Sequence, residues 1–220
     1  MRIGIILQSR MDSTRLPNKA LKIVSGKTLF ERCLEILLSS AGKNFIPILA
    51  TSERPIDMPL VDMAEAVGVK VFRGSTYDVL KRFYDASNFF ELELIARQTG
   101  DNPFLSSKLQ IQSIQYASTL GDRPFILSSR GSNLPKGLDV EVFNFQALSV
   151  ANELAGEAYD REHVTPFMLK SDRIINKKIV VANCIFPFAS YTIDTQEDLE
   201  NATKIADSNE SLPEMLVSFN

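Results

Sequence analysis

The chain has little of what metal centres and disulfide frameworks need, with one histidine and two widely separated cysteines in 220 residues. An ordinary zinc site takes three or four ligands, chiefly His and Cys, so this composition argues against the usual zinc centres. Cys33 and Cys184 stand among apolar neighbours, and we expect both to be buried free thiols rather than a disulfide.

Long hydrophobic runs are also missing. No segment approaches the roughly 18 consecutive apolar residues of a membrane-spanning helix, and no signal-peptide pattern stands at the N-terminus. We therefore expect a cytoplasmic protein without a membrane partner. The nucleophile elbow G-x-S-x-G and the dinucleotide fingerprint G-x-G-x-x-G are absent as well, so the chemistry that those motifs support is set aside.

The net charge of −3 is unevenly distributed. Residues 1–30 carry six Lys and Arg side chains against one acid, Asp12, whereas the stretch from Asp194 onward is acidic. Aromatic residues are not interleaved with the basic ones, and the whole chain is acidic. We therefore expect a small phosphate ligand rather than nucleic acid.

Apolar segments of strand length alternate with segments of helical periodicity along the first 129 residues, without a repeat or a linker. This alternation predicts one α/β domain over residues 1–220 with a mostly parallel sheet and right-handed crossovers. Ligands of such sheets bind beyond the carboxyl ends of the strands. Strands are expected at 3–7, 45–50, 69–72, 92–96 and 125–129, and helices at 28–40, 57–67, 77–87 and 106–120.

The pattern becomes less regular after residue 129. Pro166 interrupts a helix-like stretch at 159–169, and Thr195 begins a capping-box pattern that ends at Asp198. Further strands are expected at 138–143, 179–182 and 190–193, with a helix at 145–154 and another after Thr195.

The segment from Gln8 to Lys19 directly follows the first expected strand and is rich in cations and hydroxyls. Arg10, Arg15 and Lys19 can surround a triphosphate from several directions, although a solvated surface loop has the same composition. Gly26-Lys27-Thr28 ends like a P-loop, but the earlier glycine is missing and no strand precedes it, so Thr28 is better explained as a helix cap.

Two acidic residues stand at expected strand ends. Gly100 would allow a tight turn that places Asp101 beyond the fifth strand, where a hard cation bound to phosphates would lie. Asp194 follows the last expected strand. Each acid could instead cap the helix that follows it, and the residues alone leave both alternatives open.

The segment from Arg10 to Lys19 resembles the R-x-x-S-x-R-L-P-x-K signature of cytidylyltransferases that make CMP-activated sugar acids. The T-G-D element at 99–101 and the I-D-T element at 193–195 are similar to two further motifs of this family. The resemblance implies a Rossmann-like three-layer α/β/α fold of the nucleotide-diphospho-sugar-transferase type, with Mg²⁺ on Asp101 and Asp194. Asp12 and Asn18 depart from the pattern, because many relatives have glycine there. The nucleotide-binding residues so expected are Gln8, Ser9, Arg10, Ser13, Arg15, Lys19, Arg73, Ser75, Thr99 and Asp101; Arg10, Arg15, Lys19 and Asp101 are the catalytic candidates.

Two further stretches, 134–143 and 159–166, are closest to the spore-coat polysaccharide biosynthesis group of this family. Asp139 and Glu141 stand two apart on an expected strand and could face one cleft. Arg161 and His163 could contact the acceptor. Ordinary structural roles explain Asp139, Glu141 and His163 equally well.

The resemblance implies an enzyme that transfers CMP from CTP to a sugar acid or related small acceptor and releases pyrophosphate, for surface polysaccharide or glycan biosynthesis. It also implies a homodimer. Two alternatives remain, namely a glycosyltransferase that holds metal on Asp139 and Glu141, and a nucleotide-binding protein of the same fold without catalytic activity.

Overall fold

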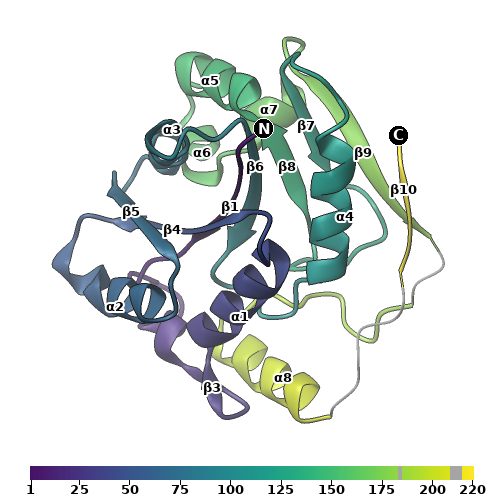
Figure 1. Ribbon diagram of the computed structural model, residues 1–220. Helices are drawn as coiled ribbons and strands as arrows, with labels where there is room; N and C mark the ends of the chain where they lie inside the picture. The colour runs from purple at the N-terminus through teal and green to yellow at the C-terminus, as the bar shows by residue number, and fades with distance from the viewer. Residues whose placement is uncertain (183–184, 209–214) are drawn as a thin grey trace.

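The structure is a computed structural model that describes residues 1–182, 185–208 and 215–220 (Figure 1). The strands form two sheets, a hairpin of β2 (Ile23–Val24) and β3 (Lys27–Thr28) and a separate eight-stranded sheet. The strands of that sheet are β1 (Ile3–Gln8), β4 (Ile46–Ser52), β5 (Lys70–Gly74), β6 (Leu94–Thr99), β7 (Phe125–Ser128), β8 (Glu141–Asn144), β9 (Ile175–Ala182) and β10 (Leu216–Phe219).

The strand order is β10-β9-β7-β8-β6-β1-β4-β5. The strands β6, β1, β4 and β5 pair in parallel, as do β7 and β9, whereas β8 and β10 run antiparallel to their neighbours. The predicted mostly parallel α/β sheet is therefore confirmed.

Helices cover both faces of the sheet, which makes three layers (Figure 1). Each face has its own apolar core, because successive side chains of a strand point to opposite sides. In β1, Ile5 and Leu7 pack into one core and Ile6 into the other. On the first face lie α1 (Leu29–Ala41), α2 (Met58–Ala66), α4 (Ser107–Ala117) and α8 (Gln196–Asp207); on the second lie α3 (Val79–Phe89), α5 (Phe145–Leu154), α6 (Ala158–His163) and α7 (Pro166–Lys170).

The helix starts agree with the predicted caps. Thr28 begins α1 through a capping box with Glu31, and Thr195 begins α8 through a capping box with Asp198. In each box the hydroxyl accepts from a backbone N–H and the carboxylate accepts from the N-cap N–H, so two otherwise unpaired donors are satisfied.

In the second half of the chain the structure confirms the helices at 145–154 and after Thr195 but corrects several other predictions. Residues 190–193 form no strand and make a single bridge between Ser190 and Lys136. The stretch 159–169 is two short helices that break at Val164, before Pro166. β8 begins at Glu141 rather than at Leu138, so Asp139 precedes the strand. The hairpin and β10 were not predicted, because strands of two to four residues give little periodicity.

No helix within the described residues is long and apolar enough to cross a membrane. Cys33 is a buried free thiol, as predicted, and burial raises its pKa. Cys184 lies outside the described residues.

Candidate active site

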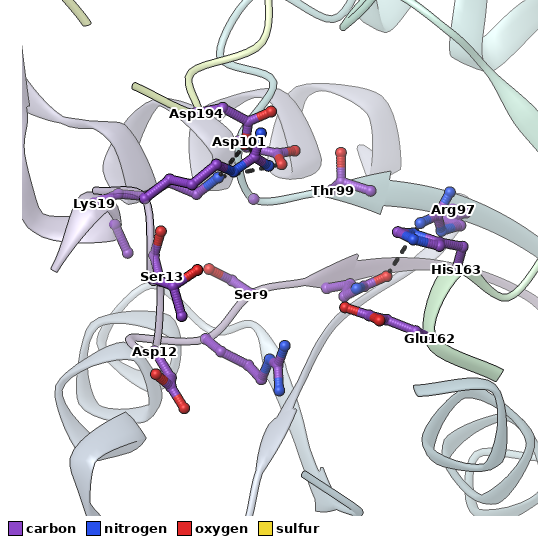
Figure 2. A pocket seen from close by; sticks show the side chains of 16 residues that line it. Ser9, Asp12, Ser13, Lys19, Arg97, Thr99, Asp101, Glu162, His163 and Asp194 are labelled. Atoms are coloured by element: carbon purple, nitrogen blue, oxygen red, sulfur yellow. Dashed lines mark hydrogen bonds and ion pairs between the residues drawn. The ribbon is translucent and has the colours of Figure 1, made fainter. Parts of the chain in front are cut away.

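A polar cavity of about 330 Å³ opens at the carboxyl ends of β1 and β6 (Figure 2). Segments that are far apart in the sequence form its wall, namely the basic loop after β1, the end of β6 with the turn after it, the end of α6, and Asp194, which precedes the N-cap of α8. The cavity is lined by Gln8, Ser9, Arg10, Asp12, Ser13, Thr14, Arg15, Lys19, Ala20, Arg97, Thr99, Gly100, Asp101, Glu162, His163 and Asp194.

The backbone of the basic loop is fastened to the segment after β4. The backbone N–H of Met11 donates to Asp57 Oδ1 over 2.7 Å, and Asp57 is almost completely buried. The Ser52 hydroxyl donates to the other carboxylate oxygen of Asp57. Hydrogen bonds to a buried carboxylate are among the stronger ones in proteins, so they fix the path of the loop backbone at Met11.

The two departures from the family pattern in this loop have physical explanations. Asp12 forms an ion pair with Arg54, and in Figure 2 its carboxylate points away from Lys19. Asn18 has φ 55° and ψ 30°, a left-handed conformation that glycine adopts freely and asparagine tolerates better than most residues. Asparagine therefore replaces glycine here at modest cost, and Arg54 neutralises the added charge of Asp12.

Asp101 and Asp194 converge on the ammonium group of Lys19, although 93 residues separate them in the sequence (194 − 101 = 93). Lys19 Nζ lies 3.0 Å from Asp194 Oδ1, 3.4 Å from Asp101 Oδ2 and 3.0 Å from the carbonyl oxygen of Ile193. Arg15 Nη2 lies 3.0 Å from the same oxygen of Asp194. The basic loop and the two acids thus form one cluster at the cavity wall (Figure 2).

The surroundings of Asp194 shift the pKa of its carboxyl group. Burial alone would raise its pKa, but the hydrogen bonds and charges of Lys19 and Lys136 outweigh burial, so the pKa is lowered. Lys136 Nζ lies 3.1 Å from Asp194 Oδ2. Both oxygens of this carboxylate therefore face cations, and the group is fully ionised at neutral pH.

Gly100 is required because β1 and β6 approach closely where they end. Its N–H donates to the carbonyl oxygen of Gln8 over 2.8 Å. A Cβ at this position would lie 2.5 Å from Ser9 Oγ and 2.7 Å from Ser9 Cβ. Only glycine lets the turn bring Asp101 beside the basic loop.

Most of the predicted nucleotide-binding residues lie together in the cavity wall, but Arg73 and Ser75 do not line it. Arg73 donates to the backbone carbonyls of Ser52 and Glu53, so it ties β5 to the end of β4. The Ser75 hydroxyl accepts from the N–H of Asp78, just before α3. These two residues shape the turn after β5, and the prediction that they seat the nucleotide directly is not supported by their position.

That turn is held by two arginines. Arg10 Nη1 donates to the Thr76 carbonyl over 2.7 Å, and Arg82 Nη1 donates to the Ser75 carbonyl over 2.8 Å. Arg82 is fully buried, and its Nε and Nη2 have no hydrogen-bond partner among the described residues. Burial, and then the charge of Arg10, lower the pKa of Arg82 to about 10.

The four residues predicted to bind the acceptor have different positions. Only His163 lines the cavity. Arg161 donates to Asp78 Oδ2 over 2.7 Å and to the carbonyls of Asn152 and Ala155, so its guanidinium fastens α6 to α3 and α5. The structure thus gives Arg161 a structural role and does not place it among the residues that line the cavity.

Glu141 is buried and does not face the cavity. Its oxygens lie 2.7 Å from Arg97 Nη1 and 3.2 Å from Arg130 Nε, and one accepts from the Thr165 hydroxyl over 2.8 Å. Burial, and then the charge of Glu141, raise the pKa of Asp139. Because Glu141 is already engaged by two arginines, the metal site that the glycosyltransferase alternative needs on this pair loses its support.

Sequence reasoning missed Arg97 and Glu162 as cavity residues. Arg97 follows a strand-like run next to the T-G-D element, so its place at a carboxyl strand end could have drawn attention. Glu162 stands in the stretch 159–166 beside His163 and gave no separate signal. Asp57, which accepts the hydrogen bond from the basic loop, was also missed, because it stands at the start of a segment with a helical pattern.

The donor set fits a magnesium ion better than a transition metal. Within the described residues no three His, Cys, Asp or Glu side chains gather as a metal cage. Mg²⁺ is usually held by one or two carboxylates together with substrate phosphates and water, and Asp101 and Asp194 provide such a pair. The ammonium group of Lys19 forms ion pairs with both carboxylates and so balances part of their negative charge.

Known proteins resemble this chain in sequence and in fold. A family model described as Cytidylyltransferase matches residues 4–216. An uncharacterised protein of Methanocaldococcus jannaschii is 40% identical over 174 residues, which cover 79% of this chain and 70% of that protein. The spore coat polysaccharide biosynthesis protein SpsF of Bacillus subtilis is 33% identical over 208 residues, 90% of this chain and 84% of its own length. The structure of a cytidylyltransferase from Leptospira borgpetersenii has a TM-score of 0.81 at 28% identity and covers 96% of this chain and 89% of that one.

Proposed function

Because the chain belongs to the cytidylyltransferase family, we propose that it transfers CMP from CTP to a sugar acid or related small acceptor and releases pyrophosphate. The observation that carries this proposal is the convergence of Asp101 and Asp194 on Lys19, in a cavity that Arg10 and Arg15 also line. The similarity to a spore coat polysaccharide biosynthesis protein supports an acceptor from surface polysaccharide or glycan synthesis.

The cations of the basic loop give the site its chemistry. Arg10, Arg15 and Lys19 bind the β- and γ-phosphates and balance the charge that develops as pyrophosphate leaves. Asp101 and Asp194 would hold Mg²⁺, which supplies further positive charge at the triphosphate when it is bound. An acceptor hydroxyl attacks the α-phosphorus in line, so catalysis comes from positioning and charge stabilisation and needs no covalent enzyme intermediate.

A pyrophosphate-release screen tests this proposal. Each of the four NTPs is paired with sialic-type, Kdo-type and smaller carboxylated or phosphorylated acceptors in the presence of Mg²⁺. We expect release with CTP and at least one acid acceptor. A preference for another NTP in every productive pair would refute the cytidylyl donor. Release of a nucleoside diphosphate from a sugar nucleotide would favour a glycosyltransferase, and neither release would favour a non-catalytic protein.

The predicted homodimer, the Mg²⁺ cofactor and the cytoplasmic location remain predictions. Size-exclusion chromatography with light scattering tests the first, and loss of pyrophosphate release on chelation, restored by added Mg²⁺, tests the second.

A further inference from the structure

A strained turn stands directly beside the cavity, between α6 and α7. Val164 has φ 70° and ψ −58°, and the N–H of Thr165 donates to the carbonyl of His163 over 2.8 Å. These values describe a classic γ-turn, which is rare, and a β-branched residue with positive φ is a clear outlier. Such strain persists only where the surroundings impose it, and it is concentrated at functional sites.

Contacts on both sides impose this conformation. Val164 is fully buried in the core of the second face. The Thr165 hydroxyl donates to Glu141, which in turn pairs with the cavity residue Arg97. Before the turn, buried Asp160 pairs with Lys170 of α7 over 2.7 Å. The turn is therefore fixed to the sheet and to both helices that it joins.

The strained turn places His163 and Glu162 at the cavity wall. In Figure 2 both residues lie beside Arg97, across the cavity from Lys19, Asp101 and Asp194. The His163 ring packs on Tyr159 with centroids 4.4 Å apart. Within the described residues the imidazole nitrogens have no hydrogen-bond or ion-pair partner, so they are available to a ligand.

This position suits a proton acceptor. In phosphoryl transfer the attacking and leaving oxygens stand roughly in line on opposite sides of phosphorus. If pyrophosphate leaves toward the cations of the basic loop, the acceptor hydroxyl enters from the opposite wall, where His163 lies. Histidine is the residue most often used as a general base.

We propose that His163 is a catalytic residue and the general base of the transfer, an inference that rests on the proposed function. An imidazole nitrogen takes the proton of the acceptor hydroxyl while the hydroxyl oxygen forms its bond to the α-phosphorus. The bond from the α-phosphorus to the oxygen that bridges to the β-phosphorus breaks, and pyrophosphate leaves with that electron pair. The imidazolium then releases its proton to water. The γ-turn at Val164 and the Thr165 hydroxyl position the ring.

His163→Gln and His163→Ala test this proposal, and Tyr77→Phe, at an exposed tyrosine outside the cavity wall, is the control. General-base catalysis contributes roughly 100- to 10,000-fold, so we expect kcat to fall by at least ~100-fold in both variants, with the KM for the NTP within about twofold. Added imidazole should restore part of the kcat of His163→Ala. Thr165→Val keeps the ring but removes its support, so we expect a smaller fall in kcat, again without a change in the KM for the NTP.

The outcomes separate this inference from the proposed function. Wild-type protein that releases no pyrophosphate with any pair would refute the proposed function and, with it, the role of His163. Active wild-type protein whose His163→Gln variant keeps kcat within twofold would refute the general base alone. A raised KM for the acceptor with unchanged kcat would reduce His163 to a binding contact, and a folded variant without imidazole rescue would argue against proton transfer.

Discussion

Replacement of Arg82 by methionine should stabilise the protein, although it removes a buried hydrogen bond. The guanidinium is fully buried, and only one of its three nitrogens has a partner among the described residues. The pKa of Arg82 is lowered to about 10, first because of burial and then because of Arg10, while Asp57 and Asp78 oppose the shift. At 1.36 kcal/mol per pKa unit, the folded state disfavours the charged form by about 3 kcal/mol.

Two losses offset this gain. The carbonyl of Ser75 loses its donor, which costs about 1–2 kcal/mol, and methionine fills less of the space beside Gly74. We therefore expect a net gain in the free energy of unfolding of about 1 kcal/mol for Arg82→Met. Because Arg82 is protonated in both the folded and unfolded states below pH 10, the gain should be constant from pH 6 to 9. It should shrink as the pH rises above about 10, where the folded wild-type protein releases the proton.

Urea denaturation measures this difference as a shift of the midpoint at constant slope. Lys81→Met on the same helix is the matched control, since the exposed Lys81–Asp85 pair should contribute less than 1 kcal/mol. A midpoint that falls in Arg82→Met by the equivalent of 1 kcal/mol or more would refute the reasoning, because the buried charge would then be stabilising. We also expect a higher KM for the NTP, since Arg10 and Arg82 hold neighbouring carbonyls of one turn. If Arg82→Met is more stable but has a higher KM for the NTP, Arg82 is retained for function rather than for stability.

Three further predictions concern single side chains. Asp101→Ala should reduce kcat at least ~100-fold in the pyrophosphate assay, which is the scale of losing a key charge-stabilising group. The control Asp122→Asn, at an exposed position outside the helices and strands, should leave kcat unchanged. Near-normal turnover of Asp101→Ala would remove Asp101 from the mechanism. Asp139→Asn should raise the free energy of unfolding at pH 7, because burial and Glu141 raise the pKa of Asp139 and so disfavour its ionised form. This gain should vanish in denaturation curves as the pH falls below about 4, where the carboxyl is protonated in both states, and a gain that persists there would contradict the electrostatic cause. Arg161→Met should lower the thermal midpoint without changing the KM for the acceptor, and a selective rise in that KM would restore the residue to the binding site.

The alternation of the first half of the chain was predictable because its strands and helices have different apolar patterns. Strand β1 is a continuous apolar run that is buried on both faces, whereas helix α1 has buried residues at helical spacing. The turn at Val164 was not predictable, since nothing local favours positive φ in a valine and the conformation comes from the contacts of Thr165 and Asp160. Residues 190–193 resemble a strand in composition, but they do not pair with a strand of the sheet. The N–H of Tyr191 donates to the carbonyl of Lys136, and the N–H of Ile193 donates to the carbonyl of Asp101.

The candidate site was predictable where a residue directly follows a strand. The sheet topology brings Arg10 and Asp101 to one edge, because β1 and β6 are parallel neighbours. Long side chains were harder to place, since a charge in the sequence does not reveal its partner. Arg73 and Arg161 have the composition of ligand-binding residues, yet backbone carbonyls and Asp78 occupy their guanidinium groups. Arg97 was missed as a cavity residue because its position depends on tertiary contacts. Its ion pair with Glu141 forms only when β6 pairs with β8, and the sequence does not reveal this pairing.

The anchor of Met11 on Asp57 has a consequence for the kinetics of ligand capture. A loop that must first become ordered slows association, whereas one whose backbone is already tied to a buried carboxylate presents its cations in fixed directions to an incoming anion. The encounter is then governed by diffusion and by the attraction between opposite charges, and its rate should decline steeply as salt is added.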